Sequence, residues 1–105
     1  MGYNLVVTEK ADELIDSVIF YIMNKLKNPQ AAGHLLDNIS EIYGRLEDNP
    51  FQFGDCKDYY LKCRGYKEAL IPGMQYILIF RISEQTVYIV GLFHTLEDYP
   101  SKVSE

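Results

Sequence analysis

One histidine stands where an apolar strand gives way to polar residues. Residues 91–100 read GLFHTLEDYP, so an apolar run reaches Phe93 and His94 follows directly, before a threonine, two acids and a tyrosine. An imidazole at the end of a strand could serve as a general acid or base. The same position also suits a side chain that only meets water where the strand stops. Position alone leaves both interpretations open.

A second candidate is Arg81, the charged residue of the otherwise apolar run 76–82. Its guanidinium could contact an anion, or its aliphatic stem could lie along apolar surface while the charged head reaches water. The chain also has nine tyrosines. Most fall on expected strand or helix faces, where the ring packs in the core and the hydroxyl stays wet.

The other motifs exclude several kinds of site. Residues 64–73, RGYKEALIPG, lack the spacing of a phosphate-binding glycine loop, and no serine lies in a nucleophile-elbow context. Cys56 and Cys63 are separated by six residues, without a CxxC motif or a pair of histidines at metal spacing. We therefore expect two ordinary thiols in a reducing cytoplasm, no metal site and no cofactor.

The net charge of −5 disfavours a protein whose main role is to grip nucleic-acid backbone, because neutralising phosphates needs clustered Lys and Arg. One stretch is locally basic but diluted by acids, and we interpret it as a solvated edge. It contains Lys57, Lys62, Arg64 and Lys67, interleaved with Asp55, Asp58 and Glu68. No apolar run approaches the roughly 18–20 residues of a membrane helix, and we expect a cytoplasmic protein without membrane association.

We assign residues 1–105 to a single domain with a disordered tail at 101–105. Two amphipathic helices are predicted in the first half, one over about residues 10–27 and one from the NP pair at 28–29 to about Asp48. Their short connection favours an antiparallel helical hairpin. We expect that hairpin to bury Leu14, Ile22, Leu36, Ile39 and Leu46.

Strands are predicted elsewhere. A short run at 3–7 and two strong apolar runs at 76–82 and 87–94 read as strands, and the last two should pair as a hairpin. The mixed aromatic stretch 59–71 is consistent with one broken strand or two short ones. The order β-α-α-β-β-β predicts an α+β fold, in which the helical hairpin packs on one face of a mostly antiparallel sheet.

The C-terminal part resembles the RelE/ParE superfamily, the toxins of bacterial type II toxin–antitoxin systems that are also called plasmid stabilisation proteins. The resembling segment, residues 64–103, contains YILIFRI and VYIVGLFHTLEDY in the family's order and spacing, including His94, Asp98 and Tyr99. The predicted element order and the NP pair at 49–50 also agree. The resemblance therefore covers nearly the whole chain.

The resemblance implies a small toxin that a cognate antitoxin neutralises, with an antitoxin segment wrapped over the hairpin and sheet. RelE-type members cut mRNA on the ribosome with Lys, Arg, His or Tyr groups on the sheet face, whereas ParE-type members poison DNA gyrase and lack that set. The catalytic candidates implied here are Lys67, Arg81, His94 and Tyr99. The candidate antitoxin-binding residues, which could also be core, are Leu14, Val18, Leu36, Ile39 and Tyr43.

Two departures from the nuclease pattern favour the ParE branch. Ile77 stands where RelE-type toxins carry a central arginine, and an RNase of that type needs cations to stabilise a developing phosphorane. Leu96 and Glu97 stand where relatives carry two arginines, so two positive charges become one apolar group and one negative charge.

We therefore favour a toxin that binds a gyrase-type protein target and is held by an antitoxin. One alternative is a ribosome-dependent mRNA endoribonuclease that uses His94 as acid or base. The other is a detoxified family member that keeps only antitoxin binding or oligomerisation. The sequence leaves a homodimer open.

Overall fold

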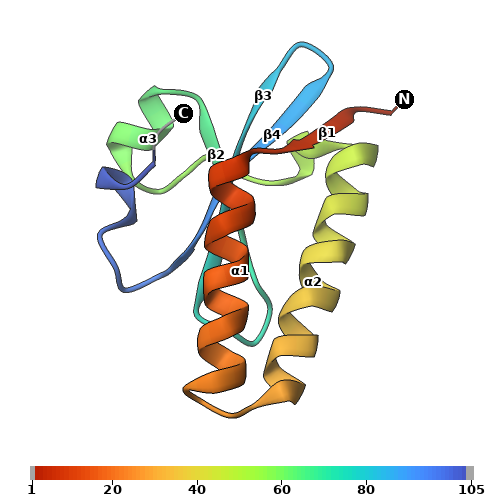
Figure 1. Ribbon diagram of the computed structural model, residues 1–105. Coiled ribbons are helices and arrows are strands. Elements are labelled where there is room, and N and C mark those ends of the chain that lie inside the picture. The colour runs from red at the N-terminus through yellow and green to blue at the C-terminus, as the bar shows by residue number, and fades with distance from the viewer. Residues whose placement is uncertain (1, 104–105) are drawn as a thin grey trace.

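The structure, a computed structural model, describes residues 2–103. Its strands are β1 (Asn4–Val7), β2 (Tyr66–Leu70), β3 (Tyr76–Ser83) and β4 (Thr86–His94). They form one sheet in the order β1-β4-β3-β2 (Figure 1). β1 pairs in parallel with β4, and the other neighbours pair antiparallel. The α+β fold with a mostly antiparallel sheet is confirmed.

Two long helices, α1 (Glu9–Asn24) and α2 (Pro29–Asp48), form the predicted hairpin. The side chain of Thr8 caps α1 by accepting from the Ala11 N–H at 3.2 Å, and Asn28 caps α2 in the same way. α1 ends earlier than the predicted 10–27, because Lys27 adopts a left-handed φ of 50° that turns the chain into α2.

The sheet carries a hydrophobic core on each face. The hairpin-side core lies between the two long helices and one face, where Leu35, Leu46 and Phe80 are fully buried. The α3-side core covers the opposite face and is centred on Leu61, Ile79 and Phe93. In Figure 1, the C-terminal segment lies with α3 (Tyr59–Cys63) at one side of the molecule, and α2 lies at the other.

The prediction of one broken strand or two short strands over residues 59–71 is wrong for its first part. Residues 59–63 form the short helix α3, because the Asp58 carboxylate accepts from the Leu61 N–H at 3.0 Å and Leu61 is fully buried against the sheet. Only residues 66–70 become β2. Two 3₁₀ turns, Pro50–Gln52 and Tyr99–Ser101, complete the described chain.

Burial of the hairpin residues follows the prediction except at two positions. Ile22, Ile39 and Leu46 are buried, as predicted. The prediction for Leu36 is wrong. This residue is 48% exposed, because its neighbour Leu35 occupies the core position of that helical turn. Leu14 is half-buried and packs beside the α3-side core.

Part of the predicted disordered tail has a defined place. Ser101 ends the last 3₁₀ turn, and Val103 packs on the α3-side core. Residues 104–105 of that prediction lie outside the described residues. Across the part of the chain that the structure describes, no helix combines the length and the apolar character needed to cross a membrane.

Candidate functional site

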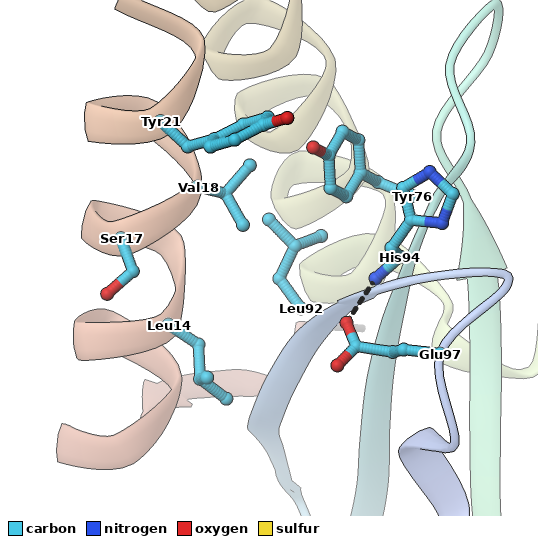
Figure 2. A pocket seen from close by; sticks show the side chains of 8 residues that line it. All are labelled: Leu14, Ser17, Val18, Tyr21, Tyr76, Leu92, His94 and Glu97. Carbon is cyan, nitrogen blue, oxygen red and sulfur yellow. Dashed lines mark hydrogen bonds between the residues drawn. The ribbon is translucent and has the colours of Figure 1, made fainter. Parts of the chain in front are cut away.

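A groove of about 340 Å³ lies between α1 and the paired ends of β3 and β4. It exists because β3 begins at Tyr76 directly opposite His94, the last residue of β4, and α1 crosses the sheet beside them. Figure 2 shows the side chains that line it: Leu14, Ser17, Val18, Tyr21, Tyr76, Leu92, His94 and Glu97. No lysine or arginine is among them.

The His94 ring is held by the turn that follows β4. Its Nδ1 accepts from the Leu96 N–H at 3.1 Å, so this nitrogen carries no proton in the arrangement described. The edge of the imidazole meets the Tyr76 ring, with centroids 5.4 Å apart and an interplanar angle of 81°. One ring nitrogen is therefore committed to local structure, and Nε2 is left for other contacts.

Glu97 places a negative charge beside the imidazole. Its carboxylate accepts from the His94 backbone N–H at 2.7 Å, drawn as a dashed line in Figure 2, and binds the Lys102 ammonium at 2.6 Å. Partial burial acts to raise the pKa of Glu97. The hydrogen bonds from the Lys102 ammonium and the His94 backbone N–H, together with the positive charge of Lys102, outweigh burial and lower the pKa overall. The carboxylate is ionised at neutral pH.

Two phenols close the other side of the groove. Figure 2 shows the hydroxyls of Tyr21 and Tyr76 pointing toward one another. Burial, followed by the nearby Tyr21 and Glu97, raises the pKa of Tyr76, so its phenol stays protonated at neutral pH. The groove therefore offers apolar surface, hydroxyl groups and one carboxylate. It can bind a partly apolar segment of another molecule, but it lacks cations that would stabilise a phosphorane.

The other catalytic candidates lie elsewhere. Lys67 Nζ is paired with the Asp55 carboxylate at 3.0 Å. The Arg81 guanidinium lies 4.3 Å from the ring centroid of Tyr88. Arg81 on β3 is paired opposite Tyr88 on β4. Tyr88 lies six residues before His94, so Arg81 and His94 are separated by roughly 20 Å along the strand direction.

The fourth candidate, Tyr99, is on the opposite face of the sheet from the groove. Its ring stacks on Phe93 in the α3-side core, with centroids 6.0 Å apart. Strand alternation is the cause, since Phe93 and His94 point to opposite faces. The structure does not bring the four candidates together, and their catalytic role stays a prediction.

The antitoxin-binding candidates are also divided. Leu14 and Val18 line the groove, and Leu36 is exposed on α2. Ile39 is 4% exposed and belongs to the hairpin-side core. Burial, with a contribution from Asp12, raises the pKa of Tyr43 to about 12, which marks a phenol packed against the same core. Leu36 is therefore the most exposed of the five, whereas Leu14, Val18 and Tyr43 are half-buried.

No sequence pattern marks Ser17, Tyr21, Tyr76 or Leu92 as groove residues, because their proximity depends on where α1 crosses the sheet. Among residues 2–103, no three His, Cys, Asp or Glu side chains gather closely enough to hold a metal ion.

A family model for the ParE toxin of type II toxin–antitoxin systems, parDE, matches residues 5–99. The chain belongs to the ParE toxin family. This confirms the resemblance carried by residues 64–103. Comparison with curated protein sequences yields no significant match.

Two solved structures share the fold of this ParE-family chain. One, from the chromosomal ParDE system of P. aeruginosa, has a TM-score of 0.70 and 17% identity, covering 88% of this chain and 95% of that one. The other, from the RelBE2 toxin–antitoxin complex of Mycobacterium tuberculosis, has a TM-score of 0.59 and 20% identity, covering 90% and 99%. Both similar structures come from toxin–antitoxin systems.

Proposed function

We propose that this ParE-family chain inhibits bacterial growth from the cytoplasm by binding a gyrase-type protein target, and that a cognate antitoxin neutralises it. The observation that carries the proposal is the chemistry around His94. The histidine is present, but its groove has no lysine or arginine, and the Glu97 carboxylate lies 2.7 Å from the His94 backbone nitrogen. Cleaving RNA would require positive charge where the phosphorane develops.

Lys102, the cation nearest to this carboxylate, does not change the balance. Its ammonium is bound to Glu97 at 2.6 Å, so the two charges offset each other and the pair leaves no excess positive charge beside His94. Arg81 and Lys67 are held on other parts of the sheet by Tyr88 and Asp55. The arrangement supports a toxin that acts by binding, because binding a protein needs shape and exposed side chains but no reacting group.

The groove also supports the antitoxin part of the proposal. Leu14 and Val18 offer apolar contact from α1, and Tyr21 and Tyr76 add hydroxyl groups next to it. Such a surface suits the apolar side chains of an extended or helical peptide segment. Leu36 provides a further exposed apolar contact on the neighbouring helix.

Inducing the chain in a bacterial host tests the target class. We expect growth arrest accompanied by a change in DNA supercoiling, while translation continues in the early phase. Early loss of translation with mRNA cut at codons would overturn the proposal in favour of the endoribonuclease. Normal growth would indicate a detoxified family member instead.

His94 variants separate the two toxic mechanisms. We expect His94→Ala to leave toxicity largely intact. His94→Asn is the sharper variant, because an asparagine oxygen can accept from the Leu96 N–H as Nδ1 does, while the amide cannot act as a general acid or base. Loss of toxicity in both variants, with the fold retained, would contradict a binding mechanism.

An antitoxin test uses a small acidic reading frame beside the gene. Co-expression of its product should restore growth. Val18→Lys should stay toxic but escape this rescue, because it places an ammonium in the apolar part of the groove. Met23→Lys, which changes an exposed apolar residue of the same helix outside the groove, should still be rescued. Equal rescue of both variants would remove the groove from the antitoxin interface.

A further inference from the structure

The locally basic stretch that the sequence shows near residue 60 forms an exposed surface on α3 and its flanks. We call it the α3 surface, and it consists of the exposed residues Lys57, Tyr59, Tyr60, Lys62 and Arg64. Tyr59 is 79% exposed and Tyr60 is 54% exposed. Exposed tyrosine side chains next to an arginine are typical of protein interfaces, where Tyr and Arg are enriched.

The acidic side chains of this stretch form hydrogen bonds or ion pairs with neighbouring residues. The Asp58 carboxylate caps α3 at the Leu61 N–H, and the Glu68 carboxylate accepts from the Lys57 N–H at 3.2 Å. Asp55 is paired with Lys67. The cations Lys57, Lys62 and Arg64 are therefore left on the outside, although four cations and three anions share the stretch.

The α3 surface is preorganised. Leu61 is fully buried in the α3-side core and fixes the short helix on the sheet. The Arg64 guanidinium lies 4.5 Å from the ring centroid of Tyr60, which holds both side chains in place without neutralising the charge. Side chains that are already ordered lose little freedom on binding, so their contacts contribute more to affinity.

The same face of the sheet extends this chemistry. Tyr66 on β2, against which α3 packs, is opposite Arg81 on β3, and Arg81 is opposite Tyr88 on β4. The Arg81 guanidinium lies over the Tyr88 ring at 4.3 Å. Tyrosine and arginine thus recur across the sheet beside α3, on the face opposite the groove.

We propose that the α3 surface binds the target protein, through a partner patch that carries carboxylate groups. This inference rests on the proposed function, which requires a protein target. Charge complementarity identifies the partner chemistry, because the exposed cations lie beside exposed tyrosines, whereas each of the three local acids already accepts a hydrogen bond from a neighbour. A nucleic acid is a weaker fit, since the whole chain carries −5 and the surface lacks the cluster of cations that a phosphate backbone needs.

Growth inhibition at graded expression levels tests the α3 surface. Tyr59→Ala and Arg64→Glu should each raise the amount of protein needed for half-maximal inhibition at least about tenfold. Both side chains are exposed, so thermal unfolding followed by circular dichroism should stay near that of the wild type. The matched controls Phe20→Ala and Lys25→Glu remove an exposed ring and reverse a charge away from α3, and they should remain as toxic as the wild type.

The outcomes are separable. Folded α3 variants that are as toxic as the wild type would overturn the inference and leave the proposed function standing. A wild type without toxicity would overturn the proposed function itself. Fluorescence anisotropy of a labelled oligodeoxythymidylate gives a third arm. If the wild type binds this oligonucleotide and Arg64→Glu abolishes the binding, the surface is assigned to single-stranded nucleic acid. That result would overturn the inference of a protein partner.

Discussion

The groove and the α3 surface lie on opposite faces of one sheet and differ in chemistry. The groove combines apolar and phenolic side chains with the carboxylate of Glu97, and no lysine or arginine lines it. The α3 surface exposes Lys57, Lys62 and Arg64 beside two tyrosines, while its acids serve local hydrogen bonds. The two surfaces therefore differ in the kind of side chain that they offer to a partner.

This difference bears on how one domain can meet two partners. The groove is apolar and bordered by a carboxylate, whereas the α3 surface is basic and aromatic. They therefore select different partner segments, and two partners need not compete for one site. If an antitoxin neutralises the chain by covering the target surface, it must extend from the groove around the sheet to α3.

The largest expected effects concern the two cores that hold these surfaces. Phe80 is buried on the hairpin side and Phe93 on the α3 side. Phe80→Ala and Phe93→Ala should each lower the free energy of unfolding by about 3–5 kcal/mol. Urea unfolding followed by circular dichroism would measure both. A loss of only a few tenths for Phe93→Ala would show that the α3 side lacks a real core.

Gly91 tests how closely the Phe93 ring and the Leu14 side chain approach the backbone of β4. A Cβ at this position would lie 2.5 Å from a ring carbon of Phe93 and 3.2 Å from a methyl carbon of Leu14, and the buried ring has little room to move. Gly91→Ala should therefore lower the free energy of unfolding by about 1–3 kcal/mol.

The matched control for Gly91 is Gly44, in the interior of α2. A Cβ there meets nothing within 4 Å, so Gly44→Ala should raise the free energy of unfolding by up to about 1 kcal/mol. Similar behaviour of both alanine variants in the same urea titration would contradict the close approach of Phe93 to Gly91.

Glu97→Gln probes the charge of the groove. Because folding lowers the pKa of Glu97, its contribution to stability is present above the ordinary value of 4.5 and is lost as the pH falls through that value toward the lowered one. The variant should cost less than about 1 kcal/mol at neutral pH, since the pair with Lys102 is partly exposed. Urea titrations over a range of pH should show the difference from the wild type shrinking in acid. A difference that grows in acid would contradict the ion pair.

The smallest perturbation is chemical and needs no mutation. Cys63 is exposed beside the α3 surface, whereas Cys56 is buried in the core beneath it. Burial first, then the charges of Glu68, Asp58 and Asp55, raise the pKa of Cys56 to about 12, although Lys67 acts to lower it. A chromogenic disulfide reagent at neutral pH should titrate one thiol in the native chain and two in urea. Two rapid thiols in the native chain would show that α3 is not held on the sheet.

Sequence patterns predicted the parts of the fold in which apolar positions repeat regularly over many residues. The two helices and the β3–β4 hairpin follow from repeating apolar positions, and the structure confirms them. α3 could not be predicted in this way, because its five residues are too few to show a helical repeat. The helix depends instead on the Asp58 cap and on the burial of Leu61. Leu35 and Leu36 show the same limit, since one helical turn has room for only one of two adjacent leucines in the core.

The candidate site was predictable only in part. His94, Leu14 and Val18 were candidates from the sequence, and they line the groove. Tyr21 and Tyr76 were not, because their contact depends on the crossing of α1 over the sheet. Arg81 and His94 point to opposite faces of the sheet and are far apart in its register. The spacing of basic residues along the sequence does not reveal this separation.

The central claim, action by binding a protein target without cleaving RNA, is tested most directly with the purified chain and purified gyrase. The supercoiling of relaxed plasmid by gyrase should be inhibited by the wild type and by His94→Asn to the same extent. In a parallel reaction, mRNA on translating ribosomes should stay intact. Unimpaired supercoiling together with mRNA cleavage that His94→Asn abolishes would contradict the account.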